Sequence, residues 1–334
     1  MKYKLLRGVA FRIIFTLVGV GLLIRTINGY GITKIVSEFE LDLKSLIVLV
    51  LSFIPTLFCY SFSWFLATDH RKMNGDLSYF RKLLLFMRMS LASIAWNNLT
   101  PFLKIGGEPL KYLMLQKYLP DKRAFESTVN YNIIHLISTG LSFIFSFVLI
   151  FVFFDYSRIF LFYVLIAFFL MFLVSLICFF TFRRRIVLFA FVFRFKLVRV
   201  LKVNLQLSLR KFKLLYLKQK KYFFISLFFD FFARFLEGLT FFFGFIFIKH
   251  PISLLSSSLL DIGRTMADTF FFFIPYQVGS REAGVRFYME KILMINSTGF
   301  ISVVLFYRLV EIFWIAFGYM LWLTTSKSFK ESRV

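Results

Sequence analysis

The amino-acid sequence predicts an all-α, polytopic integral membrane bundle, and three observations favour this class. Residues classed as hydrophobic make up 59% of the 334-residue chain, the mean hydropathy is +0.78, and there are 52 phenylalanines. A soluble domain of this length has too little interior to bury so much apolar surface. We therefore expect a single membrane domain over residues 1–334, whose helices cross the bilayer in spans of about 20 residues.

Six segments are long and apolar enough to cross roughly 30 Å of hydrocarbon. They lie near residues 9–27, 45–67, 128–154, 159–182, 222–248 and 300–324. The first has the basic start and apolar core of a signal peptide but no small-residue cleavage site, so we interpret it as a retained span. Two further stretches, 83–116 and 254–292, are apolar in pieces and interrupted by Pro, Gly and charged residues.

Basic residues predict the orientation of the spans, because loops rich in Lys and Arg stay in the cytoplasm. They gather in both terminal segments and in the connections 68–82, 117–123 and 183–221. For the spans to alternate, 83–116 must enter and leave from the cytoplasmic side and 254–292 from the opposite side. We expect about six full spans plus two opposed, broken re-entrant hairpins in an inverted-repeat-like arrangement, with both termini cytoplasmic. A bundle of eight simple spans is the alternative.

The segment 183–221 contains 13 Lys or Arg residues and no Asp or Glu. Its mixture of basic and apolar residues predicts an amphipathic segment along the cytoplasmic interface. It could gather anionic lipids or simply set the topology. The net charge of +24 is therefore attributed to topology and to lipid headgroups, and nucleic acid is not an expected partner because no recognition module surrounds the basic residues.

The two broken stretches share a weak internal repeat. Each has a Pro, a break containing Gly or Ser, a Glu seven residues after the Pro, and then a basic residue. These positions are Pro101, Glu108 and Lys111 in the first stretch, and Pro275, Glu282 and Arg286 in the second. A helix that restarts after such a break presents free N–H groups that suit a phosphate or carboxylate. Lys104 and Arg281 would add positive charge there, whereas the two Glu residues could equally cap their helices.

Further ionisable residues lie inside the apolar segments, where an unpaired charge is costly. They either face an interior pathway or form structural ion pairs, such as Asp230 with Arg234 and Arg308 with Glu311. Helical spacing places three groups on common faces: Asp230, Arg234 and Glu237; Arg308 and Glu311; and Asp261, Arg264 and Asp268.

Several uncharged or weakly basic side chains are also candidates. Asn97 and Asn98 could bond a headgroup, although Asn98 could instead cap a turn. His135 is a candidate proton relay or a packed polar contact. The two cysteines and three histidines have no metal-ligand spacing, so no metal or cofactor is expected.

Three pieces of sequence resemble a known family: NNLTPFLKIGGEPLKYLML (97–115), FIPYQVGSREAG (273–284) and FYRLVEIFW (306–314). The chain is similar to the flippase-like membrane family typified by the transmembrane region of lysylphosphatidylglycerol synthase, which includes standalone members linked to hopanoid lipids. The matching positions are Gly106, Gly107, Glu108, Lys111, Gly279, Glu282 and Arg308. Lys111 stands where the family often has Arg, and Val278 and Ser280 make the second piece poorer in glycine, which leaves lipid specificity open.

The resemblance implies movement of a lipid or lipid-linked molecule between leaflets of a bacterial cytoplasmic (inner) membrane. Membrane lipids with anionic or phosphate-bearing headgroups are the expected partners. The candidate headgroup-binding residues are Asn97, Asn98, Lys104, Gly106, Gly107, Glu108, Lys111, Arg264, Asp268, Gly279, Arg281, Glu282, Arg286 and Arg308. Because no ATP-binding loop is present, transport would be passive or coupled to an ion or proton gradient.

Two alternatives belong to other classes. A membrane-embedded transferase would use Asp261, Asp268 or Glu282 as a base, and a non-transporting protein would dock a lipid-modifying enzyme through 183–221. Synthase members of the family carry a soluble aminoacyl-transfer domain for which this chain has no room after its last span. We therefore expect no aminoacylation and no enzymatic activity.

Overall fold

The computed structural model describes residues 43–68, 73, 78–99, 107–153, 220–271, 274–295 and 299–331. The spans expected at 9–27 and 159–182, and the basic segment up to residue 219, lie outside these ranges. The described residues form helices and turns, with no strand among them, which agrees with the all-α class.

Ten α-helices make up most of the described chain. They are α3 (Leu43–Leu51), α4 (Ile54–Ala67), α5 (Tyr79–Leu99), α6 (Gly107–Leu115), α7 (Asp121–Phe153), α10 (Lys220–Leu236), α11 (Leu239–Phe247), α12 (Leu254–Phe270), α13 (Ser280–Phe287) and α14 (Phe300–Glu331). A short 3₁₀ turn, η2 (Pro275–Gln277), precedes α13, and a π-helical turn, η3 (Tyr288–Ile292), follows it.

Three helical stretches are long and apolar enough to cross a membrane: Leu43–Ala67, Asp121–Phe153 and Phe300–Thr324. They coincide with three of the predicted spans. The first is interrupted at Ser52 and Phe53, just before Pro55 in the first turn of α4, where proline lacks a backbone donor. In its composition and helix lengths the chain has the character of a membrane protein.

The segment 222–248, predicted as one span, consists of two helices, because α10 ends at Leu236 and α11 begins at Leu239, and its crossing of the membrane stays a prediction. Gly238 lies in the break, and a Cβ there would come within 2.5 Å of the Ser258 Cα on α12. The Ser258 hydroxyl also donates to the carbonyl of Phe235 over 2.9 Å. The interruption therefore comes from the close approach of α12, which the apolar sequence of 222–248 does not reveal.

Helices α5 and α6 form the first hairpin. The N–H of Gly107 donates to Asn97 Oδ1 over 2.7 Å, and the Ser93 hydroxyl donates to the carbonyl of Gly107 over 3.0 Å. A Cβ at residue 107 would lie 2.3 Å from the backbone oxygen of Ser93. Glycine is therefore required where α6 begins against the last turns of α5.

Helices α12 and α13 form the second hairpin. The chain between them turns through η2, where Tyr276 and Gln277 have φ values of 54° and 52° and Gly279 has a φ of 77°. The left-handed region costs a non-glycine residue about 1 kcal/mol or more. Gly284 lets α13 pack closely on α12, since a Cβ there would be 2.5 Å from that of Ala267.

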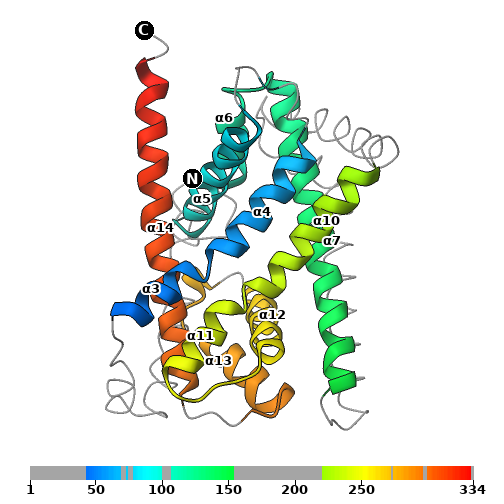
Figure 1. The fold of residues 1–334 in the computed structure, drawn as a ribbon, viewed down its shortest axis with the longest axis vertical. Coiled ribbons are helices and arrows are strands. Elements are labelled where there is room, and N and C mark those ends of the chain that lie inside the picture. Colours follow the sequence, from blue (N-terminus) through cyan, green and yellow to red (C-terminus); the bar gives the residue numbers. More distant parts are fainter. Residues whose placement is uncertain are drawn as a thin grey trace, which may run out of the picture.

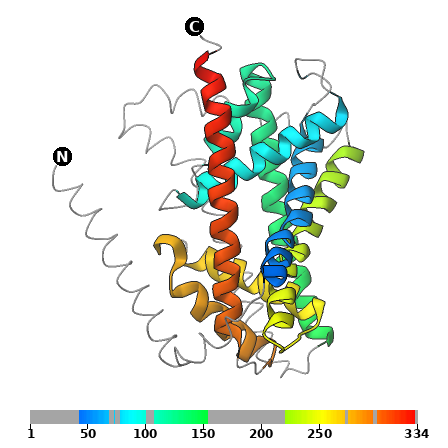
Figure 2. The same cartoon turned by 60° about the vertical axis from the view of Figure 1, so that its left-hand side comes forward.

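The two hairpins occupy opposite ends of the bundle. In Figures 1 and 2 the α5–α6 pair lies in the upper half and the α12–α13 pair in the lower half, while α14 runs past both. This arrangement agrees with opposed hairpins. The side of the membrane from which each hairpin enters, and the cytoplasmic location of both termini, stay predictions.

The bundle buries several charged side chains within an apolar core and exposes apolar side chains on its outside. Asp230, Arg281 and Glu282 are at most 1% exposed. Large apolar side chains project outward from the longest helices, among them Phe145, Val148 and Phe151 of α7 and Ile312 and Phe313 of α14. Contiguous apolar surface of this kind suits a lipid environment.

Candidate functional site

A cavity of about 260 Å³ lies in the centre of the bundle. Side chains from α4, α5, α6, α7, α10, α11, α12 and α14 line it, together with Phe53 just before α4. Its charged and amide lining consists of Asn97, Asn98, Glu108, Lys111, His135, Arg234, Glu237, Arg264 and Glu311. Among the described residues, α13 contributes nothing to the wall, so the cavity lies against the first hairpin and is separated from the restart of the second.

Lys111 brings a positive charge to the cavity from α6. Its ammonium lies 3.0 Å from Glu108 Oε1 and 4.6 Å from the centre of the Tyr131 ring. Glu108 is in the first turn of α6, as the sequence predicted, and its other carboxylate oxygen is buried without a hydrogen-bond partner among the described residues. The pair Lys111–Glu108 is thus tethered through one oxygen only.

Arg264 on α12 is held by three carboxylates. It donates to Asp261 over 2.7 Å, to Asp268 over 3.0 Å and to Glu237 over 3.3 Å. The predicted common face of Asp261, Arg264 and Asp268 is therefore confirmed. The guanidinium of Arg264 also lies 4.7 Å from the centre of the Tyr307 ring, at the cavity wall.

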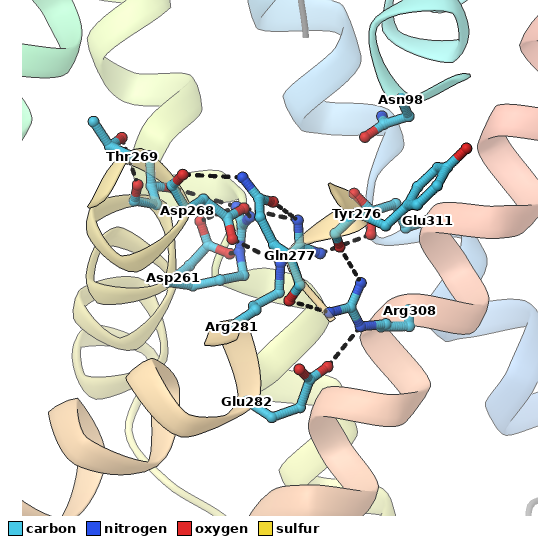
Figure 3. A network of polar contacts seen from close by, with 12 residues as sticks. Asn98, Asp261, Asp268, Thr269, Tyr276, Gln277, Arg281, Glu282, Arg308 and Glu311 are labelled. Carbon is cyan, nitrogen blue, oxygen red and sulfur yellow. Dashed lines mark hydrogen bonds and ion pairs between the residues drawn. The ribbon is translucent and has the colours of Figure 1, made fainter. Parts of the chain in front are cut away.

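Arg281 joins α12, α13 and α14 and is not among the residues that line the cavity (Figure 3). It donates to both oxygens of Asp268, over 2.8 and 2.7 Å, to Glu311 over 2.7 Å and to Gln277 Oε1 over 2.9 Å. Its side chain is 1% exposed. The positive charge expected at the restart of α13 is therefore present but neutralised, since two carboxylates face it.

Glu282 and Arg308 complete this network. One oxygen of Glu282 accepts from the N–H of Gly279 over 2.7 Å, and the other accepts from Arg308 Nε over 2.6 Å. Arg308 also donates to the carbonyls of Tyr276 and Gln277, over 3.1 and 3.0 Å, as Figure 3 shows. Glu282 therefore caps α13 and anchors it to α14, so the capping interpretation holds for this residue.

The ion pair predicted between Arg308 and Glu311 along α14 is wrong. Both side chains reach the second hairpin instead, Arg308 to Glu282 and Glu311 to Arg281. Short-range spacing could not reveal this, because the partners are 26 and 30 residues away along the chain.

A third cluster joins α7 to α10. His135 Nδ1 lies 3.0 Å from Asp230 Oδ1, and Arg234 Nη2 lies 2.7 Å from His135 Nε2 and 2.5 Å from Thr139 Oγ1. The expected direct pair of Asp230 with Arg234 is therefore replaced by an imidazole bridge. His135 and Arg234 were not among the predicted binding residues, although the spacing of Asp230, Arg234 and Glu237 on one helix face was the pattern that could have indicated them.

The other predicted site residues are divided among different places. Asn97 and Asn98 line the cavity, but Asn97 also caps α6 and Asn98 donates to the carbonyl of Ile94 over 3.1 Å. Arg286 is 45% exposed and pairs with Glu290, away from the cavity. Lys104 and Gly106 lie outside the described residues.

Comparisons with protein-family models, with curated proteins and with solved structures found no match. Within the described ranges, no group of three or more His, Cys, Asp or Glu side chains is arranged to hold a metal ion. The chemistry of the site is therefore that of arginine, lysine, carboxylate and imidazole groups around a small cavity.

Proposed function

We propose that this chain moves a phosphate-bearing lipid, or a lipid-linked molecule, between the leaflets of a bacterial cytoplasmic membrane. The observation that carries the proposal is the central cavity lined by Lys111, Arg234 and Arg264 within an apolar bundle. Charged side chains at membrane depth are costly unless they are paired or hydrated, and they are typical of transport pathways.

The size of the cavity favours a headgroup as its occupant. Sites for small molecules usually measure about 300–1,000 Å³. A cavity of about 260 Å³ suits a polar headgroup, whereas whole acyl chains would not fit. The headgroup would enter the cavity while the chains stay in the surrounding hydrocarbon.

The two hairpins supply the moving parts in this proposal. The described conformation ties the second hairpin to α14 through Arg281–Glu311 and Arg308–Glu282. Exposure of the cavity toward that end would require both pairs to separate. Opposed broken hairpins and the resemblance to flippase-like membrane proteins further support this mode of action.

A transferase receives less support from the same contacts. Each of the three carboxylates that could act as its base, Asp261, Asp268 and Glu282, accepts a hydrogen bond from an arginine. The arginine occupies a position on the carboxylate that a general base would need for the proton of its substrate. These pairings favour a transport pathway over proton abstraction.

The test is reconstitution of the full chain in liposomes that contain fluorescent phospholipids. Quenching of outer-leaflet fluorescence should proceed beyond the outer half of the probe in proteoliposomes, and stop there in empty vesicles. Anionic, zwitterionic and phosphate-free probes would separate the substrate classes. The same vesicles are examined by mass spectrometry, since a change in lipid mass without movement would favour the transferase. No movement of any probe above the empty-vesicle rate would refute the proposal.

A further inference from the structure

The wall of the cavity between α7 and α10 contains a hydrogen-bonded row of Asp230, His135 and Arg234. The two ends of the row differ in chemistry: Asp230 Oδ1 lies 3.0 Å from His135 Nδ1, and Arg234 Nη2 lies 2.7 Å from His135 Nε2. A guanidinium can only donate, so His135 Nε2 must accept. The imidazole proton is therefore on Nδ1, where it is donated to Asp230, and the ring is neutral in this arrangement.

A second proton on His135 can be added only at Nε2, the atom that faces Arg234. The protonated ring would point an N–H at the Arg234 N–H across the same 2.7 Å contact. Two donors and two positive charges cannot share this contact, so the guanidinium must leave it. Asp230 would remain in place, because its side chain is fully buried and a carboxylate pairs more strongly with the charged ring than with the neutral one.

The cavity offers space for the Arg234 guanidinium once it leaves His135. Its side chain lines the cavity, and its Nε is buried without a hydrogen-bond partner among the described residues. No described carboxylate forms an ion pair with it; its described polar partners are His135 and Thr139. The residue is 8% exposed, so the unsatisfied donor is enclosed by protein.

Lys111 faces the same space from α6. Its ammonium is buried, contacts the Tyr131 ring and is tethered to one oxygen of Glu108. A phosphate group accepts strong hydrogen bonds from both Lys and Arg. The two cations would then meet one phosphate from different helices.

The groups around His135 leave the imidazole as the proton acceptor. The titratable and charged groups around it come from four helices. They are Tyr60 of α4, Glu108 and Lys111 of α6, Tyr131 of α7, Asp230 and Arg234 of α10, and Glu237 just after α10. On α12, which also packs against α7, Asp261 and Arg264 bond to each other. Imidazole is the side chain whose ordinary pKa lies closest to neutral pH, whereas carboxyl groups ordinarily titrate at lower pH and Tyr, Lys and Arg at higher pH.

We propose that Arg234 and Lys111 form a phosphate-binding site in the cavity. Binding of phosphate at this site is coupled to protonation of His135. A proton on Nε2 frees Arg234 for the phosphate, and a bound phosphate in turn holds Arg234 away from Nε2. By thermodynamic linkage each ligand then raises the affinity for the other by the same factor. This inference deepens the proposed function, since it makes a proton the companion of the headgroup, but the site itself would also take a free phosphate.

The test is a nuclear magnetic resonance titration of the full chain, labelled at histidine with ¹⁵N, in maltoside micelles that contain no phosphate. The chain has three histidines, so the His135→Gln variant identifies the His135 signal. At high pH the ring nitrogens should report Nδ1–H and an unprotonated Nε2. The titration is repeated with dimethyl phosphate, inorganic phosphate or a short-chain phosphatidylglycerol.

The expected result is a rise of about one pH unit in the midpoint of His135 protonation at saturating phosphate, a tenfold coupling. A rise with the lipid but not with inorganic phosphate identifies a headgroup site, and the reverse identifies a free anion. Arg234→Gln should abolish the rise. If that variant does not fold, Lys111→Gln is the substitute, and it should at least halve the rise.

A midpoint unchanged by every phosphate compound, or an equal rise in the folded variants, would overturn the inference. The titration does not depend on lipid movement. A phosphate-dependent rise of the His135 midpoint without lipid movement would refute the transport proposal alone. Lipid movement with no response of His135 to phosphate would refute the coupling alone.

Discussion

Arg308 of α14 donates to Glu282 of α13 over 2.6 Å, and through this contact the C-terminal long helix is joined to the restart of the second hairpin. The same arginine bonds the carbonyls of Tyr276 and Gln277, two residues in left-handed conformation. The contact therefore holds both a tertiary junction and a strained turn.

The junction of Arg308 with Glu282 can be measured by a double-mutant cycle. We expect Arg308→Gln and Glu282→Gln each to lower stability by about 3 kcal/mol, since each leaves a partly or fully buried charge unpaired. The double variant should lose clearly less than the sum. Unfolding in maltoside micelles gives the free energies. The exposed pair Arg286–Glu290 is the control and should show a coupling below about 1 kcal/mol. Strict additivity at Arg308 and Glu282 would contradict the assigned contact.

Removal of the Arg281 charge should be the most destabilising change in the second hairpin. Arg281→Gln would remove the cation that pairs with both Asp268 and Glu311, although Asp268 would keep its bond from Arg264, and we expect a cost of about 3–5 kcal/mol. Neutralising Asp268 to Asn in the same chain should recover part of the loss. The matched variant Arg286→Gln, on the exposed side of α13, should change the unfolding free energy little. Equal effects at residues 281 and 286 would show that the buried network contributes no stability.

The crossing of α5 and α6 predicts a contrast between two glycines. Gly107→Ala should cost about 1–3 kcal/mol, because the new methyl would meet the backbone oxygen of Ser93 at 2.3 Å. Gly244→Ala should cost less, since its Cβ would meet a side-chain methyl of Val303 at 2.7 Å and no backbone atom at so short a distance. Thermal unfolding of both variants in one detergent gives the comparison. A milder effect at residue 107 would argue against the close crossing.

Lys111 is the cavity residue whose change should affect transport with the least effect on folding. We expect Lys111→Gln to slow lipid movement about tenfold, the value of one charge-assisted hydrogen bond, and Lys111→Arg to retain most of it. Lys122→Gln on the exposed surface of α7 is the matched control and should move lipid at the wild-type rate. Transport that is insensitive to the Gln change at residue 111 would exclude this lysine from the pathway.

The fold class and the positions of both hairpins could be predicted from the sequence, because they depend on local properties. Proline, glycine and charge interrupt 83–116 and 254–292 visibly, and the structure has helix ends inside both stretches. The break at Gly238 could not be predicted, since single glycines are common inside membrane helices and the cause is Ser258 on another helix.

The candidate site was predicted less completely, and for a related reason. The sequence identified Arg281, Glu282 and Arg308 as important, but helical spacing made Glu311 an equally good partner for Arg308 within α14. The observed partners come from tertiary packing, which also turns Arg281 away from the cavity. His135 is 95 residues from Asp230 in the chain, so no local pattern links them.

The left-handed turn at Tyr276 and Gln277 has a mechanical consequence. Two successive non-glycine residues in this region would relax toward extended backbone if their restraints were removed. The restraints are the bonds from Arg308 and those made by the Gln277 side chain with Arg281 and the Asp268 carbonyl. Loss of the Arg308 contact would therefore release the backbone strain at Tyr276 and Gln277, and the turn before α13 would become more extended. In the proposed transport cycle, this strain would offset part of the free energy needed to separate the second hairpin from α14.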